Sequence, residues 1–224
     1  MSTRVDAKTE VLGRIAARHA KIPVRSVLVV GCGAGQECVV LAELLGADVF
    51  GVDPYAEFAT LGSCSHRVTL HRDTAENLHY ASGSFDVAYS YHALEHFANT
   101  HAALEEMRRV LRSGGLLVVG TPNASRLVGY LSSSASVGDA WRWNLSDWRA
   151  RVGGRFTNEL GAHAGFTARQ LEAMLGDVFH DVRCVSAEYY DGVYPKWGRA
   201  VSLLEATHAS SFAYPSVYFV ATAD

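Results

Sequence analysis

The chain has 224 residues, of which 49% are hydrophobic, and its formal net charge at pH 7 is −3. This size and apolar content favour one folded domain, and the near-neutral balance argues against broad nucleic-acid binding, which needs a basic face. The sequence shows no apolar stretch of about 20 residues, no secretory signal and no C-x-x-C pair among its four cysteines. We therefore expect a cytoplasmic protein that binds no membrane and has neither a disulfide framework nor a zinc site.

The first predicted elements alternate between helix and strand. Apolar residues at helical spacing predict a helix over 8–20, which we place across the binding cleft. Four consecutive apolar residues predict a buried strand over 26–30, and a second helix is predicted over 36–45. A strand, a short turn and a helix in this order are typical of a nucleotide-binding site.

Three alternate glycines, Gly31, Gly33 and Gly35, occupy the turn between this strand and its helix. Glycine permits positive φ and close approach of the backbone to a ligand, while the helix N-terminus adds free N–H groups. Dinucleotide-binding proteins use G-x-G-x-x-G to seat a pyrophosphate, whereas this chain has Gln36 at the place of the last glycine. The spacing favours a ligand without a pyrophosphate, and the lack of a Tyr-x-x-x-Lys pair argues further against an NAD-dependent reductase.

A second apolar strand over 48–52 leads to Asp53, whose carboxylate can accept both hydrogens of a ribose diol at the carboxyl edge of a sheet. The glycine loop and this acid resemble the first motifs of the class I S-adenosylmethionine-dependent methyltransferases. In that family the loop passes under the methionine part of the cofactor, and the acid holds its ribose. The resemblance implies cofactor contacts for Gly31, Cys32, Gly33, Gly35, Asp53 and Pro54.

Residues 71–80 resemble the family's adenine-binding stretch, in which an acid, an alanine and a glutamate precede Leu-Pro-Phe. If residues 78–80 stand for that tripeptide, Thr74 replaces the acid and Asp73 lies one residue early, so both are candidates for the adenine amino group. The loop after the fourth strand resembles the one that lies against the methionine end. Together these stretches imply cofactor contacts for Asp73, Thr74, Ala75, Glu76, Ser90 and Tyr91.

The remaining elements complete an α/β pattern. The resemblance is dense over 25–122, and its last part is a helix, a glycine turn and a fifth strand. Beyond it, a capped helix is predicted over 167–175. Strands are predicted over 26–30, 48–52, 67–71, 85–90, 116–120, 182–187 and 216–223. The alternation implies a parallel sheet. The resemblance implies a Rossmann-like seven-stranded sheet, mostly parallel with an antiparallel last strand, with helices on both faces.

Several histidines are candidates for acid–base chemistry. Transfer of a methyl group to a hydroxyl needs a base, for which His92 is the first candidate and His96 the second, although either could merely hold its loop by hydrogen bonds. His92, Glu95 and His96, together with the later His163, resemble the metal-binding Glu-x-x-Glu-His cluster of some quinone and small-RNA O-methyltransferases. Because His92 replaces the first glutamate, the sequence argues against a divalent metal, and metal dependence stays open.

Residues 123–165 interrupt the regular alternation with Trp141, Trp143 and Trp148 among many Ser, Gly and Arg residues. Within a single methyltransferase domain over 1–224, a long aromatic insertion at the carboxyl ends of the strands is expected to form a substrate lid. The alternative is that the tryptophans only pack the insertion against the body. A second aromatic group over 189–197 either faces the same cleft or covers the edge of the sheet.

These observations predict an enzyme that methylates a hydroxyl of a small, aromatic or polyketide-like molecule in specialised metabolism, with S-adenosylmethionine as cofactor. Methylation of nitrogen or carbon needs no different cofactor site and stays open. A second class of alternative is a methyltransferase-like protein that transfers no methyl group, as a pericyclic catalyst or a partner subunit. The expected partner is the small-molecule substrate, and a homodimer is left open.

Overall fold

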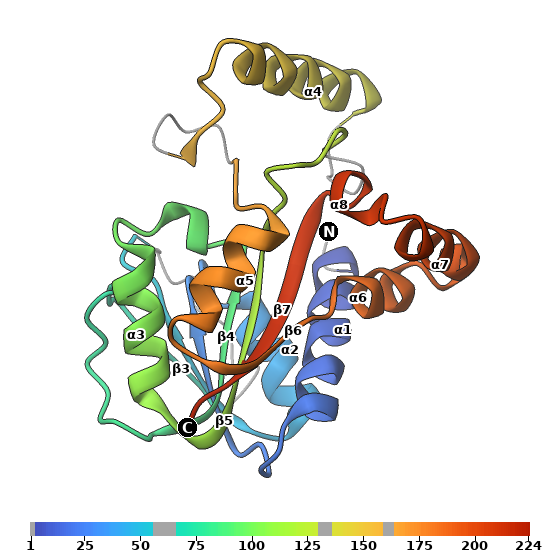
Figure 1. Ribbon diagram of the computed structural model, residues 1–224. Coiled ribbons are helices and arrows are strands. Elements are labelled where there is room, and N and C mark those ends of the chain that lie inside the picture. Colours follow the sequence, from blue (N-terminus) through green and yellow to red (C-terminus); the bar gives the residue numbers. More distant parts are fainter. Residues whose placement is uncertain (1–2, 56–65, 130–135, 159–163) are drawn as a thin grey trace.

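The computed structural model describes residues 3–55, 66–129, 136–158 and 164–224, with the side chains of the first helix described from residue 7 onward (Figure 1). A seven-stranded sheet forms its centre, with strand order β3-β2-β1-β4-β5-β7-β6. The strands are β1 (Ser26–Val30), β2 (Asp48–Val52), β3 (Val68–His71), β4 (Phe85–Tyr91), β5 (Leu111–Pro122), β6 (His180–Cys184) and β7 (Ser216–Thr222). Strands β1 to β5 pair in parallel, while β7 runs antiparallel to β5 and β6, which confirms the predicted fold class.

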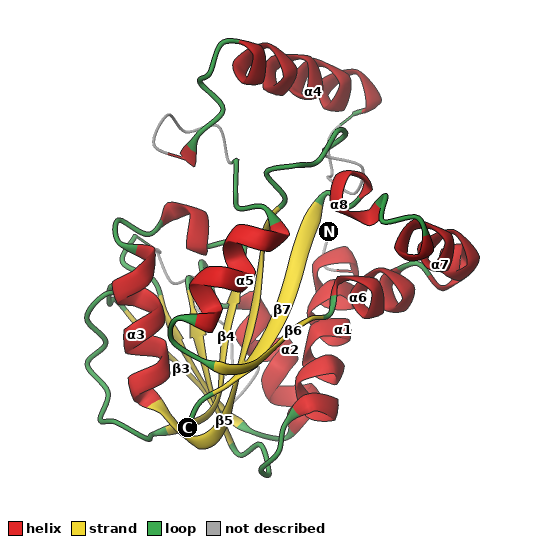
Figure 2. Cartoon of the chain, in the orientation of Figure 1, coloured by secondary structure: helices red, strands yellow, loops and turns green. Residues whose placement is uncertain are grey.

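Helices cover both faces of the sheet (Figure 2). On one face α1, α2 and α6 bury residues such as Leu12, Leu41 and Tyr189. On the other face α3 and α5 bury residues such as Leu104 and Leu171. The helices are α1 (Thr3–His19), α2 (Gln36–Leu45), α3 (Thr100–Val110), α4 (Val137–Val152), α5 (Ala168–Gly176), α6 (Ser186–Val193), α7 (Gly198–Ala206) and α8 (Ser210–Ala213), with short 3₁₀ turns η1 (Leu94–His96) and η3 (Pro195–Trp197).

The predicted sixth strand is partly wrong. The strand was expected over 182–187, but β6 ends at Cys184 and α6 begins at Ser186. The backbone N–H of Val185 still donates to Tyr218, and the N–H of Tyr189 then donates back to Val185, which starts the helix. Because Tyr189 is buried against the sheet, tertiary packing rather than local β propensity decides this boundary.

Two segments extend beyond the sheet at the carboxyl ends of its central strands. Helix α4 lies apart from the sheet, above the end of β5, and the second segment holds α7 and α8, which follow α6 in the chain between β6 and β7 (Figure 1). The two segments are joined where the side chain of Asn123 donates to the carbonyls of Ser211 and Tyr214, both at 2.9 Å. Within the described ranges, no helix is both long and apolar enough to cross a membrane.

Candidate functional site

The glycine loop after β1 uses its glycines for different physical reasons. Gly31, Gly33 and Gly35 have φ of +78°, +51° and +85°, which L side chains rarely adopt. A Cβ on Gly31 would lie 2.3 Å from Cβ of Ala93, so this glycine permits close packing between the loop and the segment after β4. A Cβ on Gly33 would meet no atom within 4 Å and would project into open space. The loop is therefore shaped to leave room beside its backbone.

Asp53 fixes the other side of this space. It follows the last residue of β2, and its carboxylate accepts hydrogen bonds from the backbone N–H of Gly33 at 3.1 Å and of Tyr55 at 2.9 Å. The parallel register of β1 and β2 pairs Val30 with Val52, which brings the glycine loop and Asp53 to one edge of the sheet. A carboxylate held in this way has lone pairs left for the two hydroxyls of a ribose.

A cavity of about 440 Å³ lies at this edge. Of the predicted cofactor residues, the structure brings Gly31, Gly33, Asp53, Pro54, Asp73, Thr74, Ala75 and Glu76 to its wall. His92, Ala93, His96, Phe97 and Ala98 line it from the loop after β4. Cys32, Gly35, Ser90 and Tyr91 are not part of this wall, and the Cys32 side chain is buried beneath the loop.

Asp73 and Thr74, the two candidates for the adenine amino group, differ in their surroundings. The Asp73 carboxylate accepts from the backbone N–H of Thr74 and of His79, and its Oδ1 also lies 2.9 Å from Nδ1 of His79. Its side chain is only 7% exposed. Thr74 is exposed at the cavity wall, while Glu76 accepts from the backbone N–H of Asn99. Asp73 thus holds the turn together by hydrogen bonds, and Thr74 is exposed to the cavity.

Polar groups lie on both sides of the His92 ring. It has a φ of +52°, which is unusual for a residue other than glycine. Its Nε2 lies 3.2 Å from the hydroxyl of Ser216, and its Nδ1 lies 4.0 Å from the carboxylate of Glu95. Glu95 is buried and accepts a hydrogen bond from the Thr121 hydroxyl at 3.1 Å. The arrangement orients an imidazole against the cavity, with a carboxylate behind it.

Ser216, whose hydroxyl contacts His92, could not be predicted from the sequence. The two residues meet because β7 inserts antiparallel beside β5, with Ser216 opposite Pro122. His96 is exposed and lines the same cavity, whereas His163 lies outside the described residues. Within the described part of the chain, no group of three or more His, Cys, Asp or Glu side chains could hold a metal ion.

A group of tyrosines packs beside the end of β4. Tyr91 stacks on Tyr218 with ring centroids 6.2 Å apart, and Tyr218 stacks on Tyr189 at 3.8 Å. Tyr190 bonds the backbone of Ser216 through its hydroxyl, donating to the carbonyl at 3.1 Å and accepting from the N–H at 3.0 Å. Burial raises the pKa of Tyr91, so its phenol stays protonated at neutral pH. The second predicted aromatic group therefore packs partly against the sheet, and it also supports the strand end that carries Ser216.

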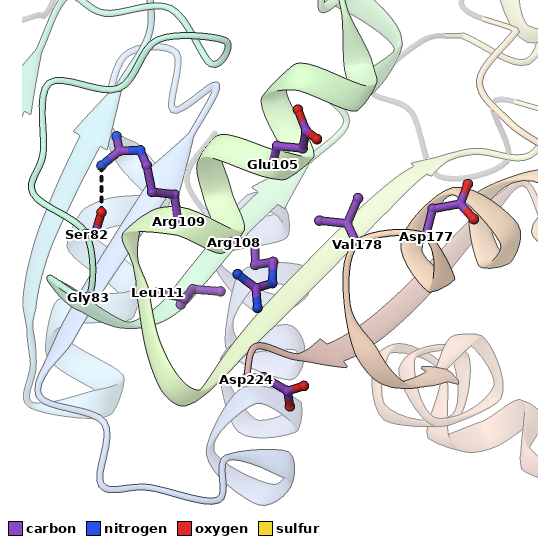
Figure 3. A pocket seen from close by; sticks show the side chains of 9 residues that line it. All are labelled: Ser82, Gly83, Glu105, Arg108, Arg109, Leu111, Asp177, Val178 and Asp224. Atoms are coloured by element: carbon purple, nitrogen blue, oxygen red, sulfur yellow. Dashed lines mark hydrogen bonds between the residues drawn. The ribbon is translucent and has the colours of Figure 1, made fainter.

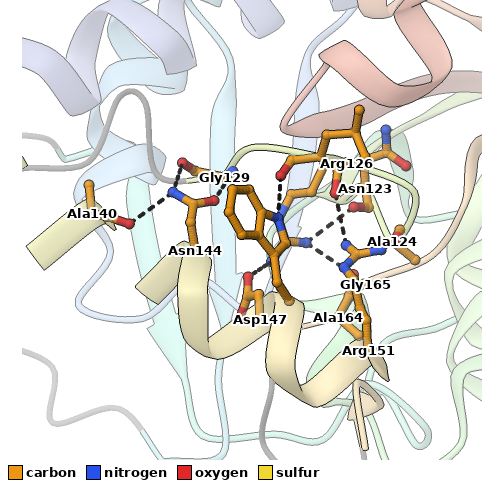
Figure 4. A network of polar contacts seen from close by, with 12 residues as sticks. Asn123, Ala124, Arg126, Gly129, Ala140, Asn144, Asp147, Arg151, Ala164 and Gly165 are labelled. Carbon is orange, nitrogen blue, oxygen red and sulfur yellow. Dashed lines mark hydrogen bonds and ion pairs between the residues drawn. The ribbon is translucent and has the colours of Figure 1, made fainter. Parts of the chain in front are cut away.

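Polar contacts hold α4 over the end of β5 (Figure 4). Arg126 is 5% exposed and donates to the Asp147 carboxylate at 3.0 Å. Arg151 donates to the carbonyls of Ala124 at 2.7 Å and of Arg126 at 2.9 Å. The Asn144 side chain exchanges hydrogen bonds with the backbone of Gly129. The docked side of α4 is polar.

The tryptophans of α4 are partly exposed. Trp141, Trp143 and Trp148 are exposed, and the indole of Trp148 donates to the backbone carbonyl of Leu127 at 2.7 Å. Leu145 on the same helix is also exposed. Trp148 thus helps the polar network to hold α4 against residues 123–129, and this segment contacts the body through Asn123, which donates to Ser211 and Tyr214. Tyr130, a further aromatic residue of the insertion, lies outside the described residues.

A second cavity, of about 640 Å³, lies at the opposite edge of the sheet (Figure 3). The end of α3, the start of β5 and the segment after α5 enclose it, and its wall mixes Arg108 and Arg109 with Glu105, Asp177 and Asp224. Ligands of open α/β sheets bind at the carboxyl ends of the strands, and this cavity lies at their amino ends. The smaller cavity at the glycine loop is therefore the candidate site.

Comparisons with known proteins agree with this choice. Residues 28–119, which include the glycine loop, Asp53 and His92, match the family described as Methyltransferase domain. An uncharacterised 37.1 kDa protein in a transposon of Streptomyces fradiae is 31% identical over 189 residues, which are 80% of this chain and 53% of that protein. A ubiquinone biosynthesis O-methyltransferase of Agrobacterium fabrum is 33% identical over 119 residues, which are 51% of this chain and 47% of that enzyme.

The chain spans about half the length of these curated relatives. Among solved structures, a SAM-dependent methyltransferase from Aquifex aeolicus superimposes with a TM-score of 0.60 at 13% identity, covering 95% of this chain and 89% of that one. This likeness concerns the fold. The match over residues 28–119, together with the glycine loop and this fold, supports a class I S-adenosylmethionine-dependent methyltransferase.

Proposed function

We propose that this protein transfers the methyl group of S-adenosylmethionine to a hydroxyl of a small aromatic or polyketide-like molecule. The observation that carries the proposal is the cavity between the glycine loop and Asp53, where open space beside Gly33 meets a carboxylate fixed by backbone N–H groups. These features fit a nucleoside whose diol meets the acid and whose remaining part follows the loop.

The residues that would hold this cofactor come from four strand ends. They are Gly31, Cys32, Gly33 and Gly35 after β1, Asp53 and Pro54 after β2, Asp73, Thr74, Ala75 and Glu76 after β3, and Ser90 and Tyr91 at the end of β4. When bound, the cofactor would supply a sulfonium-bound methyl group, to which an in-line nucleophile can bond while the thioether leaves. The protein contributes mainly by orienting the acceptor along that line.

His92 is the proposed base. A hydroxyl acceptor must lose a proton, and an imidazole at the cavity wall suits that task near neutral pH. The Glu95 carboxylate on the Nδ1 side favours the tautomer whose Nε2 accepts a proton. Ser216 occupies that nitrogen, so an acceptor either displaces the Ser216 hydroxyl or passes its proton through it. His96, on the same wall, is the second candidate.

We further propose that residues 123–165 form a substrate cap on a single methyltransferase domain. Their polar attachment to the end of β5 sets α4 beyond the edge of the sheet where the cavity opens. The choice of oxygen as acceptor atom is supported by the ubiquinone biosynthesis O-methyltransferase, which matches the chain over 119 residues. A small-molecule substrate is then the expected partner.

Two measurements test this proposal. Calorimetric titration with S-adenosylhomocysteine should show one-to-one binding at micromolar concentrations, and absence of binding would overturn the cofactor assignment. A panel of phenolic and polyketide acceptors, incubated with methyl-labelled cofactor, should yield a product whose label is an O-methyl group by NMR. A label on nitrogen or carbon would overturn the oxygen assignment and leave the methyltransferase assignment intact.

A further inference from the structure

Ser216 begins β7, beyond the regular pairing of that strand with β6. On the β6 side, Cys184 is the last residue of the strand and pairs with Phe219, which lies farther along β7. On the β5 side, Ser216 is opposite Pro122, which has no backbone N–H to donate. Because Ser216 is buried, its own N–H and carbonyl need hydrogen-bond partners within the protein.

The hydroxyl of Tyr190 is the partner of both groups. It accepts from the N–H of Ser216 at 3.0 Å and donates to the carbonyl of the same residue at 3.1 Å. The Tyr190 ring is itself packed, since it stacks on Tyr214 with centroids 4.3 Å apart and meets Tyr189 edge to face at 5.3 Å. Helix α6 therefore replaces β6 as the neighbour of this end of β7.

The side chain of Ser216 in turn contacts the ring of His92. The hydroxyl lies 3.2 Å from Nε2, while the His92 backbone N–H donates to Gly120 at 2.8 Å and the Tyr91 ring lies beside the imidazole with centroids 4.4 Å apart. His92 has a φ of +52°, a conformation that persists only where the surrounding structure holds it. The position of the imidazole therefore depends on the position of Ser216.

We propose that Tyr190 is a positioning residue for His92 and acts through Ser216, an inference that rests on the proposed function above. Helix α6 fixes the backbone of Ser216, and the Ser216 hydroxyl orients the imidazole, which lines the cavity at the glycine loop. Tyr190 is not part of the wall of that cavity. Its effect on the reaction is therefore transmitted by two hydrogen-bonded contacts and requires no contact with the acceptor or the cofactor.

Four variants of the full chain test this connection. Tyr190→Phe keeps the stacked ring and removes its hydroxyl. The matched control is Tyr194→Phe, which removes the hydroxyl of a tyrosine that stacks on Tyr190 and directly follows α6. Ser216→Ala removes the hydroxyl that contacts His92, and Ser216→Thr keeps a hydroxyl at that place.

Two readouts are measured on each variant. The first is the set of NMR signals of the His92 ring in the protein without acceptor, at constant pH, assigned by their loss in His92→Gln. The second is kcat with a hydroxyl acceptor that the wild-type protein methylates. Thermal unfolding shows that each variant is folded, and calorimetric titration with S-adenosylhomocysteine shows that its cofactor site is intact.

We expect Tyr190→Phe and Ser216→Ala each to displace the His92 ring signals and to lower kcat by about 10-fold, because the imidazole loses the contacts that orient it. Ser216→Thr should recover about 5-fold of kcat relative to Ser216→Ala. Tyr194→Phe should keep the wild-type ring signals and a kcat within about 2-fold. Affinity for S-adenosylhomocysteine should stay within about 2-fold in all four variants.

Unchanged His92 signals or an unchanged kcat in Tyr190→Phe would overturn the inference, because Tyr190 would then only stabilise α6. An equal effect of Tyr194→Phe would also overturn it, since the aromatic packing rather than the hydroxyl of Tyr190 would be responsible. Failure of the proposed function gives a different result. The wild-type protein would then methylate no hydroxyl acceptor, while the His92 signals would still respond to Tyr190→Phe and not to Tyr194→Phe.

Discussion

The imidazole of His92 lies 3.2 Å from the hydroxyl of Ser216, a residue 124 positions away in the chain. The contact joins the loop after β4 to the first residue of β7, with Glu95 on the other side of the ring. The hydroxyl of Ser216 contacts one ring nitrogen of His92, and the carboxylate of Glu95 lies 4.0 Å from the other. The geometry makes the role of His92 directly testable.

Replacing His92 by Gln should lower kcat by about 100- to 1,000-fold with a hydroxyl acceptor, since a positioned base contributes on that order. The affinity for S-adenosylhomocysteine should change little, because the side chain is proposed to act on the acceptor. Initial rates and calorimetry on the same preparation separate the two effects. His101→Gln, at an exposed site on α3, is the matched control. An unchanged kcat would move the assignment to His96.

Replacing Asp53 by Asn should weaken S-adenosylhomocysteine by at least about 10-fold, since a carboxylate that accepts from the ribose hydroxyls is lost. Asp48 begins the same strand and is exposed at its amino end, so Asp48→Asn should leave the affinity unchanged. Calorimetric titration of both variants checks this pair. Equal affinities for the two variants would place the ribose elsewhere.

Gly31→Ala should destabilise the fold and weaken cofactor binding together. The added methyl group would meet Cβ of Ala93 at 2.3 Å, in addition to the strain of a positive φ. Gly46→Ala, at the end of α2, adds only the backbone strain of a positive φ (+61°), because no atom lies near the added methyl group. We expect losses of unfolding free energy of about 2–4 kcal/mol for Gly31→Ala and about 1 kcal/mol for Gly46→Ala, measured by urea denaturation. Similar losses at the two sites would contradict the proposed contact.

Asp147→Asn should loosen α4, because it leaves the guanidinium of Arg126 buried without its carboxylate. Removing one partner of a buried ion pair costs about 3–5 kcal/mol, and part of that cost should appear as local opening of 123–165. Faster hydrogen exchange in α4, with the sheet unchanged, is the expected readout. Asp139→Asn removes a carboxylate of the same helix whose ion pair with Arg142 is exposed, and it should have little effect. Protection of α4 that survives Asp147→Asn would show that other contacts hold the cap.

Asp86 should make the fold sensitive to acid. Burial alone would raise the pKa of this carboxyl, but hydrogen bonds from the backbone N–H groups of Arg25 and Ser26 and from the Arg112 guanidinium lower it. A lowered folded-state pKa contributes stability that is present above the unfolded value of about 3.9 and is lost as the pH falls through the folded value. Urea denaturation at pH 7 and below pH 4 should show that Asp86→Asn lowers stability mainly at pH 7. An equal loss at both pH values would contradict the linkage.

The parts of the fold that could be predicted from the sequence are those in which local pattern and packing agree. β1 and β2 occur at the predicted residues, because each is an apolar run that ends before a residue of another kind. Gly31 follows β1 and Asp53 follows β2. β6 was placed too far along the chain, since the residues after Cys184 have strand-like composition but turn into α6 to bury Tyr189.

The residues of the candidate site also differ in how far the sequence predicts them. The glycine loop and Asp53 could be predicted because their chemistry is local in sequence and their strands are adjacent. The partners of His92 could be predicted only in part: Glu95 is three residues away, while Ser216 depends on the register of β7 against β5.

The exposure of the tryptophans has a spectroscopic consequence. All four tryptophans of the chain, Trp141, Trp143, Trp148 and Trp197, are between 38% and 66% exposed, and none belongs to the buried core. The native fluorescence should thus be that of indoles in water, with little further shift when the sheet unfolds. Three of the four report on α4, so ligand-dependent changes in their emission and quenching would follow movement of the cap without any added label.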